Sequence, residues 1–151
     1  MSKKNSPIII LMADDDPDDR LLTLEAFKET KIPHDLRFVK DGEELMDYLN
    51  QHGEYEDPVL SPHPGLILLD LNMPRKDGRE ALKDIKSDNK LRPIPIIILT
   101  TSKAEEDILY TYDLGASSFI TKPATFDELI DTVNVLGKYW LEIAKLPPGV
   151  L

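Results

Sequence analysis

Residues 8–16, IIILMADDD, place six apolar residues directly before three aspartates. Two similar apolar runs occur at residues 66–69 (LILL) and 96–99 (IIIL). All three runs are rich in branched side chains, do not alternate with polar residues and are too short for buried helices. Such runs are typical of central strands in a parallel sheet, whose two faces are both covered.

Two further strand candidates have a mixed character. Residues 36–39 (LRFV) and 118–121 (SFIT) combine apolar with polar side chains, which suits the partly covered edges of a sheet. Helical patterns separate the five candidates, so strands and helices alternate along the chain. Because crossovers between parallel strands are right-handed, this alternation predicts a doubly wound α/β fold with five parallel strands and five helices.

The predicted helices begin at polar residues that can cap them. Asp16 precedes Pro17, a pair typical of a helix start, and the apolar residues Leu21, Leu24 and Phe27 follow at helical spacing. The other predicted starts are Asp41 with Glu44, Gly78, and two matches to the capping-box pattern, Ser102 with Glu105 (a helix ending at Gly115) and Thr125 with Glu128.

Composition excludes several classes of protein. The chain has 151 residues, with 18 Lys and Arg against 28 Asp and Glu, and a formal net charge of −10. Such acidity argues against nucleic-acid binding, which depends on neutralising phosphates. Because the chain has no Cys, thiol chemistry, Fe–S clusters and disulfides are excluded. No apolar run approaches the ~20 residues that cross a bilayer, and the polar start is no secretory signal, so we expect a cytoplasmic protein without membrane association.

The length predicts one domain. We expect a disordered N-terminus over residues 1–6, the domain over residues 7–145 and a short tail over residues 146–151. A Pro-rich segment at residues 52–64 is longer than an ordinary helix-to-strand connection. We interpret it as a surface loop, without assigning it a role.

Chemically reactive residue types follow the predicted strands where those strands end. The acids are Asp14 and Asp15 after the first strand and Asp70 at the end of the third. Thr100 ends the fourth strand, and Lys122 follows the fifth. Open α/β sheets bind ligands at the carboxyl ends of their strands. If the first and third strands are neighbours, as in the strand order 2-1-3-4-5, three carboxylates converge.

Converging carboxylates need a positive partner, because like charges at contact distance raise one another's pKa. Oxygen ligands without His or Cys favour Mg²⁺ or Mn²⁺ over zinc. Lys122 supplies a second positive charge, and Thr100 supplies a hydroxyl donor. Together with a nucleophilic carboxylate, these groups are the parts of phosphoryl transfer to aspartate.

Each of these residues also has a simpler interpretation. An Asp-rich turn after a strand is more often a helix cap than a metal site. Asp70 and Thr100 taken alone could be ordinary turn residues, and Lys122-Pro123 is a common pair before a helix. Their joint placement at four strand–helix junctions favours the phosphoryl-handling interpretation.

Several short motifs occur together: the acidic group at 14–16, DLNMPRKDG at 70–78, LTTS at 99–102, GASSF at 115–119 and KP at 122–123. With these motifs the chain resembles a response-regulator receiver domain over roughly residues 7–140. The resemblance implies the flavodoxin-like receiver fold with strand order 2-1-3-4-5. It also implies a phosphorylation-dependent signalling protein of two-component systems, and not an enzyme beyond its own phosphotransfer and dephosphorylation.

The resemblance implies a role for each acid. Asp70 is the phosphoacceptor. Asp15 is a direct ligand of Mg²⁺ or Mn²⁺, Asp14 acts mostly through water, and the carbonyl of Asn72 completes the metal set together with Asp70.

The resemblance also implies a switch. Thr100 is the switch hydroxyl, Lys122 binds the phosphoryl group and Phe119 is the switch aromatic. Thr100 would move toward the phosphoryl group and vacate space for Phe119, which remodels the face made by the fourth helix, the fifth strand and the fifth helix. Thr101 and Ala124 depart from the commonest pattern, where a smaller residue and an aromatic are found, and so leave the hydrolysis rate and switch details open.

The last helix is predicted to carry an apolar seam. A helix over residues 126–144 would be ~28 Å long, more than a five-stranded sheet can cover. We therefore expect its last turns, with Tyr139, Trp140 and Ile143, to protrude and form the contact of a homodimer. The alternative is packing against the chain's own first helix. Only residues 145–151 follow, so we expect the output to be protein contact.

A narrower resemblance concerns the insert and the ending KYWLEIAKLPP at residues 138–148. Both are similar to small single-domain regulators that pair with phytochrome histidine kinases. This implies a phosphohistidine donor on such a kinase, which would dock at the amino end of the first helix and the loop after the fifth strand.

Three other functions fit the sequence less well. A Mg²⁺-dependent phosphohydrolase needs a second Asp two residues after the nucleophile, where this chain has Asn72. A receiver-like module that is never phosphorylated would not need the complete acceptor set. A nucleotide-binding module would need a Gly-rich loop after the first strand, and none is present.

Overall fold

The computed structural model describes residues 7–148, and the predicted disorder of residues 1–6 lies outside the described residues. Strands and helices alternate as expected, with a short 3₁₀ helix and a π-helical turn in addition. The elements are β1 (Ile8–Ala13), α1 (Pro17–Lys28), β2 (His34–Val39), α2 (Gly42–Asn50), η2 (Gly53–Tyr55), β3 (Leu66–Leu69), α3 (Gly78–Lys86), β4 (Ile96–Thr100), α4 (Glu105–Leu114), β5 (Ser118–Thr121), α5 (Phe126–Gly137) and η3 (Lys138–Ile143).

The five strands form one parallel sheet in the order β2-β1-β3-β4-β5. This confirms the predicted doubly wound fold and its strand order. The three non-alternating runs occupy the centre of the sheet, where β3 and β4 are buried at every residue. The two mixed segments form the edges, and β5 is only half-buried.

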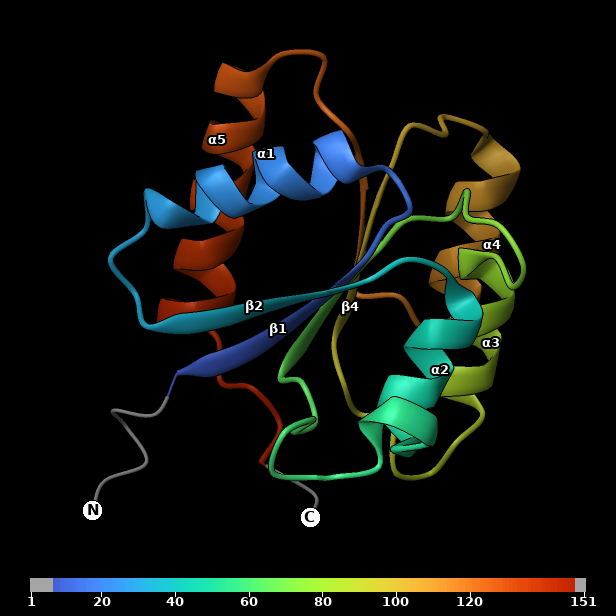
Figure 1. The fold of residues 1–151 in the computed structure, drawn as a ribbon. Helices are drawn as coiled ribbons and strands as arrows, with labels where there is room; N and C mark the ends of the chain where they lie inside the picture. Colours follow the sequence, from blue (N-terminus) through green and yellow to red (C-terminus); the bar gives the residue numbers. More distant parts are fainter. Residues whose placement is uncertain (1–6, 149–151) are drawn as a thin grey trace.

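Helices cover both faces of the sheet (Figure 1). On one face α1 and α5 pack side by side over a cluster that includes Ile10, Met12 and Leu68. On the other face α2, α3 and α4 cover Leu11 and Ile67 with their neighbours. Because successive strand residues point to opposite faces, each central strand contributes to both clusters.

Most predicted helix starts are confirmed. The side chains of Asp16, Asp41 and Thr125 accept hydrogen bonds from the first turns of α1, α2 and α5. A capping box that was not predicted starts α3, where Asp77 and Glu80 satisfy each other's backbone N–H groups.

The capping box predicted at Ser102 is wrong, because α4 begins later, after Ala104. The Ser102 hydroxyl instead donates to Asp107 across 2.7 Å and accepts from the Ala104 N–H. Gly115 ends the helix with φ of 113°, as expected for a left-handed C-cap.

The apolar stripe predicted for α1 is partly confirmed, since Phe27 is buried and Leu24 is half-buried. Thr23, Ala26 and Phe27 are buried, whereas Leu21 is 56% exposed. Leu21 and Phe27 have helical spacing. The stripe that faces the sheet, however, consists of Thr23, Ala26 and Phe27. Leu21 therefore faces solvent beside the start of the helix.

The last helix is helical to Ile143, but not as one regular α-helix. After Gly137 it widens into the π-helical turn η3. Trp140 is half-buried against the cluster beneath α1 and α5, so the expectation that it protrudes is not met. Tyr139 and Ile143 are 50% and 62% exposed, as expected.

The Pro-rich insert is held to the domain by several hydrogen bonds. The Tyr48 hydroxyl donates to the Pro62 carbonyl across 2.7 Å, and Arg37 donates to the Leu60 carbonyl across 2.6 Å. Ser61 is buried, while Val59 and Leu60 face solvent. The insert is therefore an ordered surface loop. Within residues 7–148, none of the helices combines the length and apolar character needed to cross a bilayer.

Candidate functional site

The carboxyl ends of β1 and β3 bring three acids together. Ala13 and Leu69 are register partners on neighbouring strands, so the residues that follow them emerge side by side. Carboxylate oxygens of Asp14, Asp15 and Asp70 all lie within 4.8 Å of one another. Asp14 and Asp70 are buried and Asp15 is exposed, so the group opens to solvent on one side.

Lys122 neutralises part of this group. Its Nζ donates to Asp14 Oδ2 across 2.7 Å and to Asp70 Oδ2 across 3.2 Å. A third bond, of 2.6 Å, reaches Asp19 Oδ2 on α1. The backbone N–H of Lys122 donates to the Thr100 carbonyl across 2.7 Å, which fixes the base of the side chain.

Thr100 and Asn72 complete the surroundings of Asp70. The Thr100 hydroxyl, which is fully buried, donates to Asp70 Oδ1 across 2.7 Å. The Asn72 backbone N–H donates to the same oxygen across 3.2 Å. The Asp70 carboxylate is therefore surrounded by a hydroxyl, an amide and an ammonium. Such donors can hold the added negative charge of a tetrahedral group.

Burial and hydrogen bonding act in opposite directions on the pKa of Asp14. Burial raises its pKa above the ordinary value, although bonds from Lys122 and from the Asp16 N–H act in the opposite direction. Burial lowers the pKa of Lys122, but its bonds to Asp14 and Asp19 outweigh burial and raise the pKa above the ordinary value. The Lys122 side chain is therefore held as an ammonium paired with these acids.

The acids have the chemistry of a site for a hard divalent cation. The three-acid group contains oxygen donors only, which suits Mg²⁺ or Mn²⁺. Both carboxylate oxygens of Asp14 already accept hydrogen bonds, from the Asp16 N–H and from Lys122. Asp15 is exposed, and its side chain accepts no such bond from the described residues. Among the three acids, Asp15 therefore offers the carboxylate most open to solvent.

The remaining predicted residues lie apart from the acids. Asp16 is the N-cap of α1, as predicted. Phe119 lies on the edge strand β5, half-buried against the cluster beneath α2, α3 and α4. Tyr139, Trp140 and Ile143 lie in η3, after the carboxyl end of α5 and away from the ends of the strands.

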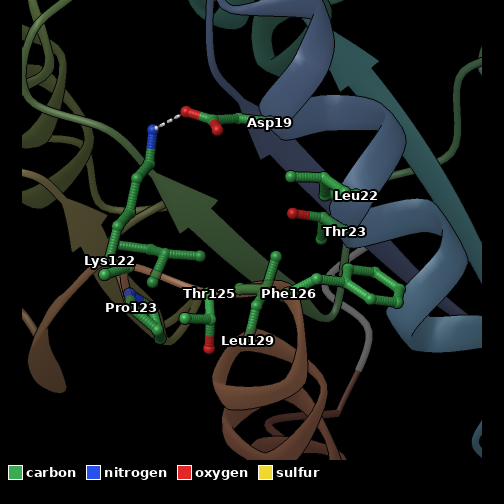
Figure 2. A pocket seen from close by; sticks show the side chains of 10 residues that line it. Asp19, Leu22, Thr23, Lys122, Pro123, Thr125, Phe126 and Leu129 are labelled. Atoms are coloured by element: carbon green, nitrogen blue, oxygen red, sulfur yellow. Dashed lines mark hydrogen bonds and ion pairs between the residues drawn. The ribbon is translucent and has the colours of Figure 1, made fainter.

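A cavity of about 140 Å³ lies beside the acids, between α1 and the start of α5 (Figure 2). Leu22 and Thr23 line it from α1, and Pro123 and Phe126 from the other side. It lies at the amino end of the first helix and the loop after the fifth strand, where the family resemblance implies that a kinase docks.

Sequence reasoning missed Asp19. An acid in the first turn of a helix is common, because the helix dipole favours it there, and this hides any further role. Its partner Lys122 is 103 positions away in the chain, so no local spacing connects the two. Only the predicted adjacency of the first helix to the loop after the fifth strand could have pointed to this pair.

The chain matches the response regulator receiver domain over residues 10–134. It belongs to the response-regulator receiver family. The match spans the three acids, Thr100 and Lys122, and confirms the family resemblance drawn from the motifs.

Relatives of this receiver domain include phytochrome response regulators. It is 41% identical to Response regulator Rcp1 of Synechocystis sp. over 145 residues, which cover 96% of this chain and 97% of Rcp1. The crystal structure of Mn²⁺-bound Rcp1 superposes with a TM-score of 0.87 at 42% identity, covering 93% of this chain and 99% of that one. The phosphorylated cyanobacterial phytochrome response regulator RcpA gives 0.89 at 43% identity, with 94% and 99% coverage.

Proposed function

We propose that this protein is a response regulator that accepts a phosphoryl group on Asp70 from a phosphohistidine of a histidine kinase. A carboxylate oxygen of Asp70 attacks phosphorus, the phosphorus–nitrogen bond breaks, and the imidazole leaves with its electron pair. One observation carries the proposal: Asp70 lies among two further acids, the Thr100 hydroxyl and the Lys122 ammonium.

Asp15, Asp14, Asp70 and the carbonyl of Asn72 would hold a Mg²⁺ or Mn²⁺ ion. Such an ion supplies charge neutralisation for the incoming phosphoryl oxygens. Thr100 and Lys122 then stabilise the oxygens of the acyl phosphate by hydrogen bonding and by charge. The Mn²⁺-bound structure of Rcp1 supports this assignment.

The kinase is proposed to be a bacterial phytochrome. Support comes from relatives whose names place them with phytochromes: RcpA is a cyanobacterial phytochrome response regulator, and a bacteriophytochrome response regulator, RtBRR, is 35% identical. The kinase would dock over the cavity between α1 and the start of α5, next to Lys122. A cytoplasmic location goes with this pairing and stays a prediction.

The output is proposed to be protein contact on the face made by α4, β5 and α5. Thr100 ends β4, and its register partner Thr121 lies on β5 with Phe119, so a change at the hydroxyl reaches the edge strand directly.

A homodimer through η3 is part of the proposal. Tyr139 and Ile143 supply exposed apolar area, while Trp140 supports them from below because it packs on the domain's own core. We expect Ile143→Glu to lower the mass measured by sedimentation, with Val59→Glu, at an exposed site in the insert, as the matched control. An unchanged mass for Ile143→Glu contradicts this interface.

Phosphorylation is tested by incubating the protein with acetyl phosphate and Mg²⁺ and measuring intact mass. The wild type should gain one phosphoryl group, and Asp70→Asn or chelator should abolish the gain. Asp77→Asn is the matched control, because Asp77 caps α3 outside the three-acid group. Continuous turnover of p-nitrophenyl phosphate, without stoichiometric labelling of Asp70, would contradict the proposal and support the phosphohydrolase.

A further inference from the structure

The shortest bond of Lys122 goes to an acid outside the three-acid group. Figure 2 shows Asp19 reaching from α1 toward the Lys122 ammonium. The Nζ–Oδ2 distance is 2.6 Å for Asp19, against 2.7 Å for Asp14 and 3.2 Å for Asp70. Asp19 is not among the acids whose oxygens gather within 4.8 Å. The ammonium therefore bonds as closely to an acid outside the three-acid group as to Asp14 inside it.

The Lys122 ammonium uses all its N–H donors on carboxylates. Lys has three N–H donors, and three acids accept from Lys122. Two of those acids, Asp14 and Asp70, also belong to the three-acid group. Lys122 and a divalent cation therefore compete for the same carboxylates, whereas Asp19 bonds Lys122 from outside the three-acid group.

Burial favours Asp19 as the alternative partner. The Asp14 side chain is fully buried and that of Asp70 is 8% exposed, whereas Asp19 is 31% exposed and stays partly hydrated. The backbone of Lys122 is fixed to Thr100, so only the side chain can redistribute among the acids. Asp19 can keep the ammonium near the site when Asp14 and Asp70 take another partner.

We propose that Asp19 is a positioning residue that holds the Lys122 ammonium toward α1 and so leaves oxygens of Asp14 and Asp70 available to a divalent cation. Without Asp19 the ammonium would rest on Asp14 and Asp70 alone and oppose the cation there. The inference deepens the proposed function and depends on its metal site.

The test measures binding of Mn²⁺ alone, without a phosphodonor, by isothermal titration calorimetry. In Asp19→Asn the Kd should rise about five- to tenfold, the change expected when a charged competitor gains a desolvated partner. The matched control is Asp18→Asn, which removes the same charge from the same turn but at an exposed side chain without a bond to Lys122. Its Kd should change less than about twofold, and Asp19→Glu should restore most of the affinity.

A double-mutant cycle separates action through Lys122 from direct attraction of the cation. In a Lys122→Met background, Asp19→Asn should change the Kd less than about twofold. An equal loss in both backgrounds overturns the inference, as does an unchanged Kd in Asp19→Asn. If Lys122→Met does not fold, Lys122→Gln serves in the same cycle. Failure of the wild type to bind Mn²⁺ would instead contradict the metal site of the proposed function.

Discussion

The Thr100 hydroxyl donates to Oδ1 of Asp70 across 2.7 Å, so the last residue of β4 directly contacts the residue that follows β3. The family resemblance implies that Thr100 moves toward Asp70 on phosphorylation. In this structure the hydroxyl already points at the acceptor, and Phe119 is half-buried against the core. Thr100 and Phe119 thus lie on neighbouring strands, β4 and β5, with the Thr100 hydroxyl already bonded to Asp70.

Thr100→Val keeps the shape of the side chain and removes its hydroxyl. We expect the free energy of unfolding to fall by about 1–2 kcal/mol, because a buried carboxylate loses a hydrogen bond. Urea denaturation measures this. Thr101→Val, at the exposed neighbour, is the control and should stay within about 0.5 kcal/mol. Equal effects at the two positions would show that the bond contributes nothing.

Gly78→Ala should disturb the acceptor loop. A Cβ at Gly78 would collide with the Asp70 carbonyl oxygen and crowd the Leu71 backbone, because the first residue of α3 packs directly on that loop. We expect a loss of about 1–3 kcal/mol in thermal or urea unfolding, the range for overpacked sites. Gly137→Ala is the control: its nearest neighbour atom is 4.0 Å away, so a helical alanine should be neutral or stabilising there. Similar losses at both glycines would refute the close packing.

Asp14→Asn should stabilise the protein at pH 7. Burial raises the pKa of Asp14, so the charged form opposes folding at neutral pH. The folded state then binds a proton more readily than the unfolded chain, and the wild type regains this stability as pH falls toward the ordinary value of 3.8. The variant should therefore exceed the wild type by about 0.5–2 kcal/mol at pH 7, a typical gain at a functional site, and by less near pH 4.

Urea midpoints at the two pH values measure that difference. The exposed Asp18→Asn should show no such pH-dependent gain. A variant of Asp14 that is less stable than the wild type at pH 7 would mean that the bond from Lys122 outweighs the burial of the carboxylate.

Arg79→Met should weaken the junction between α3 and the start of α4. Arg79 donates two 2.7 Å bonds to Asp107, which hold the pKa of that carboxyl down at about 2. We expect a loss of about 1–2 kcal/mol at pH 7, because the pair is bidentate and only partly exposed. Because the pKa of Asp107 is lowered in the folded state, the ion pair stabilises the protein fully above pH 3.8, the ordinary pKa of this carboxyl. That stability is lost as the pH falls to about 2.

The difference between wild type and Arg79→Met should therefore shrink across that acidic range when followed by circular dichroism. Arg92→Met, at an exposed arginine of the loop before β4, is the control and should match the wild type at every pH. A difference that persists at the lowest pH would assign the effect to packing of the Arg79 side chain.

The strands and the acceptor set could be predicted because their signals are local. The run at residues 8–13 has one physical explanation, a strand buried on both faces, and parallel topology brings its following acids to those of β3. Capping by Asp16 was equally local. The site residues that the motifs identified all lie within a few residues of a strand end.

The errors arise where several local solutions have similar energies. Ser102 matches a capping box, but its hydroxyl finds Asp107, whose position depends on Arg79 from another helix. Leu21 fits the apolar stripe of α1, but the tilt of that helix on the sheet decides which stripe is buried. Asp19 was missed for the same reason, since its role exists only once α1 lies beside Lys122.

The backbone hydrogen bond between Lys122 and Thr100 limits how a change at Asp70 can affect the rest of the domain. The Lys122 backbone N–H donates to the Thr100 carbonyl. This hydrogen bond must therefore break before β4 and the segment after β5 can slide past each other. A change at Asp70 can then reach β5 through rotation of the Thr100 and Lys122 side chains while this backbone bond is kept. Such rotations take picoseconds to nanoseconds when exposed and seldom limit a slower chemical event. The rates at which the acyl phosphate forms and is hydrolysed would therefore set the rate of signalling.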